Sequence, residues 1–216
     1  VFNFEHLGLG SDKWTSRFDP LAFKRAIARH QQGLHGRGWN SLFLNNHDLP
    51  RAVSRFGDDR PEWRELSAKQ WALVLHMMQG TPFIYQGEEL GMTNAHFTEL
   101  GQYRDLEAIN AYRQRVEEAR CQSPESMMAA LALIGRDNSR TPMQWDASRY
   151  AGFTPADAAT EPWIGVNPNH VEINAAEEFD DPDSVYSFYK KLIAMRHDSA
   201  TVATGEWNLV AADSEQ

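Results

Sequence analysis

The N-terminal half of the chain repeats one pattern of hydrophobic and polar positions, in which a short apolar run is followed by a longer stretch with helical spacing. Apolar runs typical of strands cover residues 1–7, 42–46 and 83–85. Helical spacing runs from Pro20 to about Gly33 and from Ser67 to Met78. The order strand, helix, strand, helix, strand is that of consecutive βα units, and it predicts an α/β fold with a parallel sheet.

Local signals mark the ends of these helices. Asp19-Pro20 supplies an N-cap followed by a proline at the first helical position. Ser67 and Gln70 have the spacing of a capping box, so the second helix is expected to begin at Ser67. Thr81-Pro82 should break that helix.

The pattern changes in the second half of the chain. Residues 103–119 predict one helix, and Ser123-Pro124 predicts the start of another. Residues 135–171 show no periodicity and are rich in Asp, Asn, Pro and Gly, which predicts a long loop without regular structure. Asp181-Pro182 should open a last helix, and a strand-like piece, residues 207–210, begins after Gly205.

These elements predict a part of a barrel with a second domain beginning after it. Insertions at the carboxyl end of a strand are how a (β/α)₈ barrel builds the wall of its active site. We therefore expect residues 1–200 to form a partial (β/α)₈ barrel with an insertion at about residues 93–178, and residues 201–216 to start a β-domain. A complete barrel takes about 250 residues. Three βα units cannot close one, so a fragment of a longer chain is expected.

Composition narrows the class of protein. The 216 residues are 42% hydrophobic and 24% charged, which is typical of a globular protein with a sizeable core. A net charge of −9 and a pI near 5.3 argue against nucleic acid or a membrane surface as the main partner. Cys121 is the only cysteine, which excludes an internal disulfide and permits the cytoplasmic location that we expect.

The second predicted strand ends in the leading candidates for chemistry. Asn45, Asn46, His47 and Asp48 follow the apolar run directly. Parallel sheets and barrels bind ligands outside the carboxyl ends of their strands, so these side chains are placed where a substrate would lie. The alternative is that the two asparagines are turn residues and that His47-Asp48 caps the next helix.

Other ionisable groups favour structural roles. Glu88 and Glu89 could form a carboxylate pair with Asp48, but bonds to loop backbone or to Arg51 are the favoured interpretation. Glu5-His6 could line an outer cleft, although framework polarity is favoured. Two further groups, residues 58–60 and Arg136-Asp137, are expected to be solvated charges or loop ties. The histidine spacing predicts no metal site, and no cofactor is expected.

Several long motifs resemble glycoside hydrolase family 13, the α-amylase superfamily. Residues 43–51 resemble its strand-seven motif, and residues 80–94 resemble the strand-eight segment of its α-glucosidase branch. Residues 137–145 are similar to a motif in the insertion of that branch. The resemblance is strongest to oligo-1,6-glucosidase, dextran glucosidase and trehalose-6-phosphate hydrolase. It implies the C-terminal portion of a TIM barrel, from strand six onward, with the start of a C-terminal β-sheet domain.

The resemblance also implies roles for four residues. Asp48 matches the third catalytic carboxylate, which is neither nucleophile nor proton donor but binds sugar hydroxyls and helps to distort the ring. His47 matches a histidine that binds the same non-reducing-end glucose, and Arg140 matches an arginine that reaches into that subsite. Glu107 matches a carboxylate that reads the leaving-group sugar. Leu49 stands where oligo-1,6-glucosidases commonly have glutamine, which bears on chain-length preference.

The implied parent activity is hydrolysis, with retention, of terminal α-glucosidic bonds in short oligosaccharides. An α-1,6 bond, as in isomaltose, is the expected substrate linkage. The family's nucleophilic Asp and its acid/base Glu lie on strands four and five, so both are expected upstream of Val1, and the chain alone should be inactive.

Two alternatives remain open. One is a transglycosylating relative of the sucrose isomerase or trehalose synthase type, which the products formed from isomaltose and sucrose would identify. The other is a non-catalytic barrel used for binding or assembly. The joint presence of His47, Asp48 and Arg140 argues against the second, and the codons upstream of Val1 would decide it.

Overall fold

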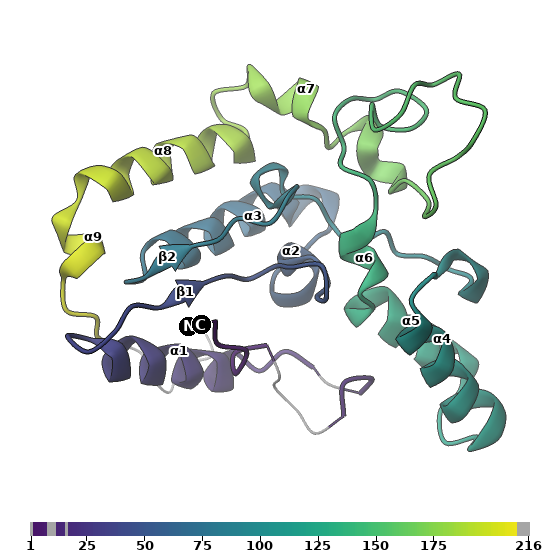
Figure 1. Ribbon diagram of the computed structural model, residues 1–216, viewed down its shortest axis with the longest axis horizontal. Coiled ribbons are helices and arrows are strands. Elements are labelled where there is room, and N and C mark those ends of the chain that lie inside the picture. The colour runs from purple at the N-terminus through teal and green to yellow at the C-terminus, as the bar shows by residue number, and fades with distance from the viewer. Residues whose placement is uncertain (1, 8–11, 16, 211–216) are drawn as a thin grey trace.

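A computed structural model describes residues 2–7, 12–15 and 17–210. Its central feature is a parallel pair of strands flanked by helices (Figure 1). Strand β1 (Ser41–Leu42) pairs with β2 (Thr81–Pro82), with Ser41 opposite Thr81. Phe2 adds an isolated parallel bridge to Ser41. The predicted parallel α/β order is therefore confirmed.

The strands are shorter than the sequence predicts. Of the predicted strand at residues 1–7, the structure describes residues 2–7, which contribute one bridge and then turn, with Leu7 N donating to Phe4 O at 3.0 Å. Of residues 42–46 only Leu42 belongs to β1, and residues 83–85 follow β2 without belonging to it. The ladder is still continued by Phe83 N, which donates to Leu42 O at 2.7 Å. Apolar patterning marks where a strand is buried, whereas its length depends on the backbone of the neighbouring strand.

Helix α1 (Pro20–Leu34) begins as predicted and α3 (Pro61–His76) does not. The Asp19 side chain accepts a hydrogen bond from Ala22 N at 3.0 Å, as an N-cap should. Helix α3 starts at Pro61, six residues before the expected start at Ser67. The Ser67 hydroxyl instead lies inside the helix and accepts from Asp58 N at 2.9 Å. The prediction of a capping box was therefore wrong. A short helix that was not predicted, α2 (Ala52–Phe56), lies between β1 and α3.

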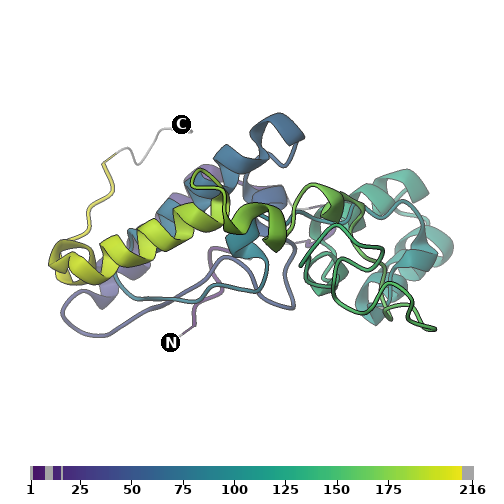
Figure 2. The same cartoon turned by 90° about the horizontal axis from the view of Figure 1, so that it is seen from above.

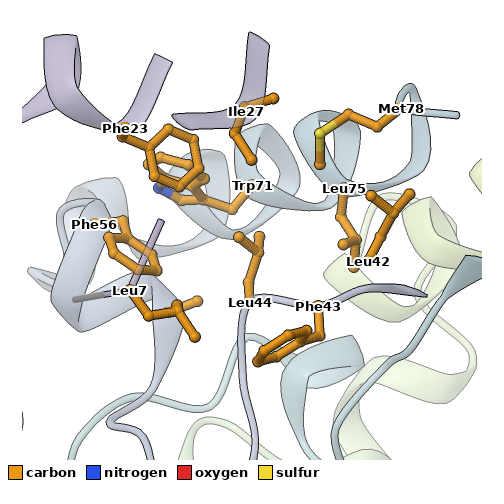
Figure 3. Packing of buried hydrophobic residues seen from close by; sticks show 11 residues of the cluster. Leu7, Phe23, Ile27, Leu42, Phe43, Leu44, Phe56, Trp71, Leu75 and Met78 are labelled. Carbon is orange, nitrogen blue, oxygen red and sulfur yellow. The ribbon is translucent and has the colours of Figure 1, made fainter. Parts of the chain in front are cut away.

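The main hydrophobic core lies between β1 and helices α1 and α3 (Figure 3). Leu42 and Leu44 pack in one cluster with Ile27, Trp71 and Leu75, the last two from α3. Burying each such side chain contributes about 1.5–3 kcal/mol. The ring of Phe43, which lies between them in sequence, packs against the ring of Phe2 at 5.4 Å and of Phe4 at 5.1 Å. The strand is apolar on both faces, as its sequence predicts.

Helix α8 (Val185–Asp198) covers α3 (Figures 1 and 2). Its N-cap is Ser184, whose hydroxyl accepts from Ser187 N at 3.0 Å, so the predicted start at Asp181-Pro182 was three residues too early. A short helix, α9 (Ala200–Thr204), follows it. Residues 207–210 form no strand within the described part of the chain, because a strand needs a partner to complete its ladder.

The insertion forms a separate lobe beside the strands (Figures 1 and 2). Its predicted helices are present as α4 (Leu106–Tyr112), continued by the π-helical segment η3 (Arg113–Glu118), and as α5 (Pro124–Ile134). Ser123 caps α5 as expected, accepting from Ser126 N at 3.2 Å. Residues 135–171 are not featureless, because they contain α6 (Asp137–Arg140) and the 3-10 turn η4 (Pro168–Val171). The remaining elements are η1 (Glu88–Leu90), η2 (Leu100–Gln102) and α7 (Ala175–Phe179).

Among residues 2–7, 12–15 and 17–210, no helix has the length and apolar character needed to cross a bilayer.

Candidate active site

The loop that follows β1 presents His47 and Asp48 to solvent. Their side chains are 72% and 48% exposed, so a substrate could reach both. Asn46 shapes the loop, because its side-chain oxygen accepts from Asp48 N at 2.8 Å. Neither His47 nor Asp48 caps a helix, since the N-cap of α2 is Arg51. The turn alternative is therefore right for Asn46, and the capping alternative is wrong for His47-Asp48.

Asn45 ties the two ends of this loop together. Its side-chain oxygen accepts from Ala52 N at 2.5 Å, which closes the loop between β1 and α2. Its amide nitrogen donates to Glu88 Oε2, also at 2.5 Å. Asn45 is buried, so these bonds hold the loop on its interior side, while the side chains of His47 and Asp48 remain exposed to solvent.

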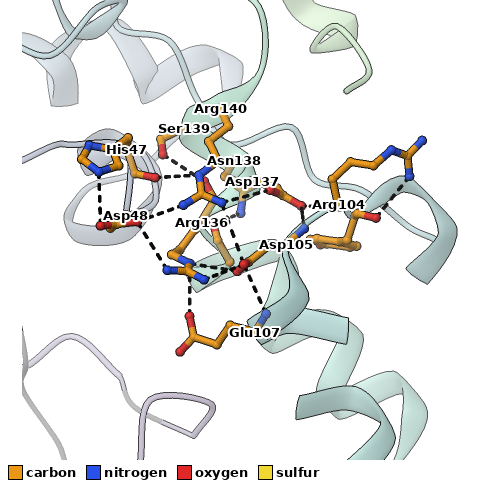
Figure 4. Close-up of polar contacts among 12 residues, drawn as sticks. His47, Asp48, Arg104, Asp105, Glu107, Arg136, Asp137, Asn138, Ser139 and Arg140 are labelled. Carbon is orange, nitrogen blue, oxygen red and sulfur yellow. Dashed lines mark hydrogen bonds and ion pairs between the residues drawn. The ribbon is translucent and has the colours of Figure 1, made fainter. Parts of the chain in front are cut away.

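Arg140 of α6 lies against the loop between β1 and α2, residues 43–51, which we call the rim loop (Figure 4). Its Nη2 is 2.9 Å from Asp48 Oδ1, and its Nε donates to the carbonyl of His47 at 2.8 Å. His47 Nε2 lies 3.3 Å from the other carboxylate oxygen, Asp48 Oδ2. The structure thus brings together three of the four residues that the sequence singled out. Two of them come from one loop, and the third comes from the insertion.

One turn of helix, α6, holds Arg140 in place. Its buried Asn138 donates to three carbonyls at the end of α5, those of Leu131, Ala132 and Gly135, at 3.0–3.2 Å. The carbonyl of Ser139 accepts from Tyr85 Oη at 3.1 Å. Each residue of α6 therefore contacts a different element, which is why this short helix has a defined place.

Asp137, also in α6, is fully buried, which corrects the expectation of a solvated charge. Its Oδ2 accepts from Arg104 N at 2.6 Å and from Asp105 N at 2.8 Å. It ties the insertion to the start of α4, so the loop-tie part of that prediction is right. Residues 58–60 are solvated charges and loop ties, as predicted. Asp58 pairs with Arg60 at the surface, and Asp59 Oδ2 contacts His96 at 2.7 Å.

Arg136 and Asp105 are the functional candidates that sequence reasoning missed. Arg136 lies within the site, where its guanidinium contacts Asp105, Glu107 and Asp48 (Figure 4). Glu107 is thereby connected to the other three predicted site residues. One signal was available: Arg136 precedes Arg140 by four residues, and that spacing places two side chains on the same face of a helix.

Burial and hydrogen bonding act in opposite directions on Asp105. Its carboxylate is 3% exposed, and such burial alone would raise its pKa. Hydrogen bonds from Arg136 and from Glu107 N outweigh burial and hold the pKa below its ordinary value. Asp105 is therefore a buried, charged anchor for the guanidinium of Arg136.

Glu88 is buried and Glu89 is partly buried, and both are structural, as favoured, with hydrogen bonds to the backbone of their loop. Glu88 also bonds side chains that were not expected, because Oε1 accepts from Tyr189 Oη at 2.9 Å and Oε2 accepts from Asn45. Burial raises the pKa of Glu88 to about 7, although both hydrogen bonds oppose that shift. The guanidinium of Arg51 donates to carbonyl oxygens, from Nη1 to Gln86 O at 2.6 Å and from Nη2 to Ser139 O at 3.4 Å.

Glu5-His6 belongs to the framework. Glu5 pairs with Arg29 at 2.6 Å and with His30 at 2.7 Å, and the buried His6 Nε2 is 2.9 Å from Phe43 O. Burial lowers the pKa of His6 to about 4, so its ring is neutral at physiological pH. Within the described residues, no cluster of three His, Cys, Asp or Glu side chains could hold a metal ion.

Parallel βα units with a carboxylate and guanidinium groups beyond the end of a strand are typical of α/β barrel enzymes. The family model described as "Alpha amylase, catalytic domain" matches residues 1–205. The chain therefore belongs to the α-amylase catalytic-domain family, glycoside hydrolase family 13, and it is part of a (β/α)₈ barrel.

Two curated relatives show how much of a longer protein the chain covers. It is 57% identical to an α-glucosidase of Pediococcus pentosaceus, matching 100% of this chain and 39% of the relative. It is 52% identical to an oligo-1,6-glucosidase of Parageobacillus thermoglucosidasius, with 99% and 38% covered. The chain thus spans about two fifths of the length of these relatives.

Two solved structures have closely similar coordinates. Trehalose-6-phosphate hydrolase of Bacillus licheniformis matches with a TM-score of 0.91 and 46% identity, over 100% of this chain and 38% of that one. A mutant isomaltulose synthase of Erwinia rhapontici, in complex with its natural substrate sucrose, matches with a TM-score of 0.91 and 40% identity, over 99% and 38%.

Proposed function

We propose that the protein containing this chain is a retaining α-glucosidase. It hydrolyses terminal, non-reducing α-glucosidic bonds of short oligosaccharides, preferably α-1,6 bonds as in isomaltose. The observation that carries the proposal is the arrangement of Asp48, which stays half exposed although Arg140 lies 2.9 Å away. The similarity to an α-glucosidase and to oligo-1,6-glucosidases supports the same activity.

Asp48 and its neighbours bind the non-reducing-end glucose. A carboxylate can accept charge-assisted hydrogen bonds from two sugar hydroxyls, and such bonds strengthen as the ring approaches an oxocarbenium-like transition state. Arg140 orients the Asp48 carboxylate through a contact with Oδ1. His47 contributes a further polar contact to the same sugar, and Glu107 reads the sugar that leaves.

The bond-breaking groups lie elsewhere in the protein. Retaining glycosidases need a nucleophile and an acid/base about 5–5.5 Å apart. We propose that these are an Asp and a Glu on strands outside the chain, and that Asp48 serves as the third carboxylate. Coverage of only 38–39% of the curated relatives is in keeping with this division.

The decisive experiment uses the product of the complete gene. Turnover of isomaltose should release glucose, and Asp48→Asn should abolish most of it while leaving the fold intact. An Asp48→Asn enzyme with unchanged kcat/KM would refute the proposal.

A second candidate is an isomerising relative, which the similarity to isomaltulose synthase favours. Incubation with isomaltose and with sucrose separates the two functions. The proposed hydrolase releases glucose from isomaltose, whereas an isomerising enzyme converts sucrose to a disaccharide of the same mass as sucrose.

We also propose a domain boundary and a location. Residues 1–200 belong to the barrel, with the insertion at about residues 93–178, and residues 201–216 open a β-domain. The end of the family match at residue 205 supports this boundary. Limited proteolysis of the complete protein should then cut near Gly205. The enzyme acts in the cytoplasm, which cell fractionation would test.

A further inference from the structure

Arg136 contacts three carboxylates that come from two parts of the chain (Figure 4). Its Nε and Nη2 donate to the two oxygens of Asp105 at 2.9 and 2.6 Å. Its Nη1 lies 3.4 Å from Asp48 Oδ1, and its Nε lies 3.2 Å from Glu107 Oε2. One guanidinium therefore connects the rim loop after β1 to the first turn of α4.

Asp105 fixes how Arg136 is oriented. A bidentate pair between a guanidinium and a carboxylate holds both planar groups in one relative geometry. Asp105 is itself fixed, because it caps α4 through a bond from Glu107 N at 3.2 Å and is buried. Because Nε and Nη2 both bind Asp105, the direction in which Nη1 points toward Asp48 is fixed.

The carboxylates of Asp48 and Glu107 depend on Arg136 to different degrees. Asp48 Oδ1 has a closer donor in Arg140, at 2.9 Å against 3.4 Å. Glu107 Oε2 is held by Arg136 and by Lys13, whose Nζ lies 2.8 Å away in an exposed pair. Exposed lysine pairs restrain a carboxylate weakly. Arg136 Nε, at 3.2 Å, is farther from Glu107 Oε2 than Lys13 Nζ is, but it is the partner held in a fixed direction. Loss of Arg136 should therefore leave Glu107 with only the flexible lysine, while Asp48 stays in place.

We propose that Arg136 is a positioning residue that fixes Glu107 relative to Asp48 and so sets the preference for a sugar over a non-sugar leaving group. The inference rests on the proposed function, in which Asp48 binds the first sugar and Glu107 the second. A sugar leaving group has hydroxyls that a well-placed carboxylate can bind. An aryl leaving group has no hydroxyls for Glu107 to bind, so the rate at which an aryl glucoside is hydrolysed should not depend on the position of Glu107.

The test compares isomaltose with 4-nitrophenyl α-glucoside in the complete gene product. Arg136→Lys keeps the positive charge but removes the planar guanidinium and its N–H donors. It should lower kcat/KM for isomaltose about 10-fold, the loss expected for one hydrogen bond to a charged group, mainly through KM. Its kcat/KM for the aryl glucoside should change by less than about 2-fold. Arg149→Lys is the matched control, because Arg149 pairs only with the exposed Glu161 among the ion pairs of the described residues.

A second variant keeps the test sharp if Arg136→Lys folds poorly. Glu107→Gln should reproduce the selective loss of isomaltose hydrolysis, and adding Arg136→Lys to it should cause no further selective loss, since both act through one contact. Equal losses for both substrates, or additive selective losses, would overturn the proposal. Asp48→Asn reports on the proposed function separately, because it should lower hydrolysis of both substrates alike.

Discussion

Arg140 holds two groups of the same loop at once: Nη2 lies 2.9 Å from Asp48 Oδ1 while Nε donates to His47 O at 2.8 Å. The first contact orients a side chain and the second fixes the backbone that carries it. The insertion thus contributes to the site by holding the rim loop of the barrel, and the contact offers a direct way to test the loop's importance.

Arg140→Lys should lower kcat/KM about 10- to 100-fold for glucosides of every leaving group. Lysine keeps the charge but cannot serve two acceptors in fixed directions, and a hydrogen bond to a charged group contributes about 1.5–3 kcal/mol. Steady-state kinetics of the complete gene product would measure the loss, with Arg149→Lys as control. A variant as active as the parent would show that the loop is held by other contacts.

Asp137→Ala should lower the free energy of unfolding by about 2–4 kcal/mol. The change leaves the backbone N–H groups of Arg104 and Asp105 without their acceptor, and an unsatisfied buried donor costs about 1–3 kcal/mol. Denaturant titration would measure it. Asp58→Ala, which removes a carboxylate from a surface pair with Arg60, should leave the midpoint nearly unchanged.

Glu88→Gln should change how stability depends on pH. The folded pKa of Glu88 is about 7 and its ordinary value is 4.5, so the unfolded chain binds fewer protons between these values. The contribution of Glu88 is therefore fully present below pH 4.5 and is lost as pH rises to about 7, a change of about 3 kcal/mol. His6 acts in the opposite sense, because its pKa is lowered to about 4 and stability rises with pH from about 4 to 6.5.

The two slopes oppose each other in the parent protein. Burial also raises the pKa of Glu178 to about 7, so Glu178 acts in the same sense as Glu88 in both proteins. Removing the acid in Glu88→Gln should therefore shift the slope of the unfolding midpoint between pH 5 and 6.5 toward a rise, relative to the parent. Unfolding curves across that range would check this. An unchanged profile would mean that Glu88 does not titrate there.

Gly87→Ala should destabilise the protein by about 1–3 kcal/mol. Gly87 has a φ of 84°, in the left-handed region, and an added Cβ would overlap Met92 Sδ and lie 3.1 Å from Arg51 Nη1. Thermal unfolding would measure the loss. Gly33→Ala is the matched control, because its position near the end of α1 is open and the change should stabilise the helix by about 0.5–1 kcal/mol.

The 216-residue chain on its own should show no turnover of 4-nitrophenyl α-glucoside above background. The proposed nucleophile and acid/base are not part of it. The chain also exposes Phe2, Phe4 and Phe83 around the strands, and a surface of this kind promotes association. Light scattering and a coupled activity assay would test both expectations. Measurable turnover by the purified chain would place catalytic groups within it.

The sequence by itself determined the features that depend on near neighbours. Asp19 and Ser123 cap helices through bonds to the third residue beyond, so each cap could be read from a few adjacent positions. The buried run at Leu42 to Leu44 and the polar cluster after it were equally local. The motif around Asp48 could be recognised for the same reason, since its residues are consecutive.

Only the tertiary structure decided which distant charges meet. Arg136 and Asp48 are 88 positions apart, and Glu88 and Tyr189 are 101 apart, so no local pattern could pair them. Arg136 was interpreted as a solvated charge or a loop tie because α6, the single turn that follows it, has no periodicity and is held by contacts with α5, Tyr85 and the start of α4. Periodicity and capping act over a few residues, whereas the position of such a turn depends on packing between elements that the chain brings together only when it folds.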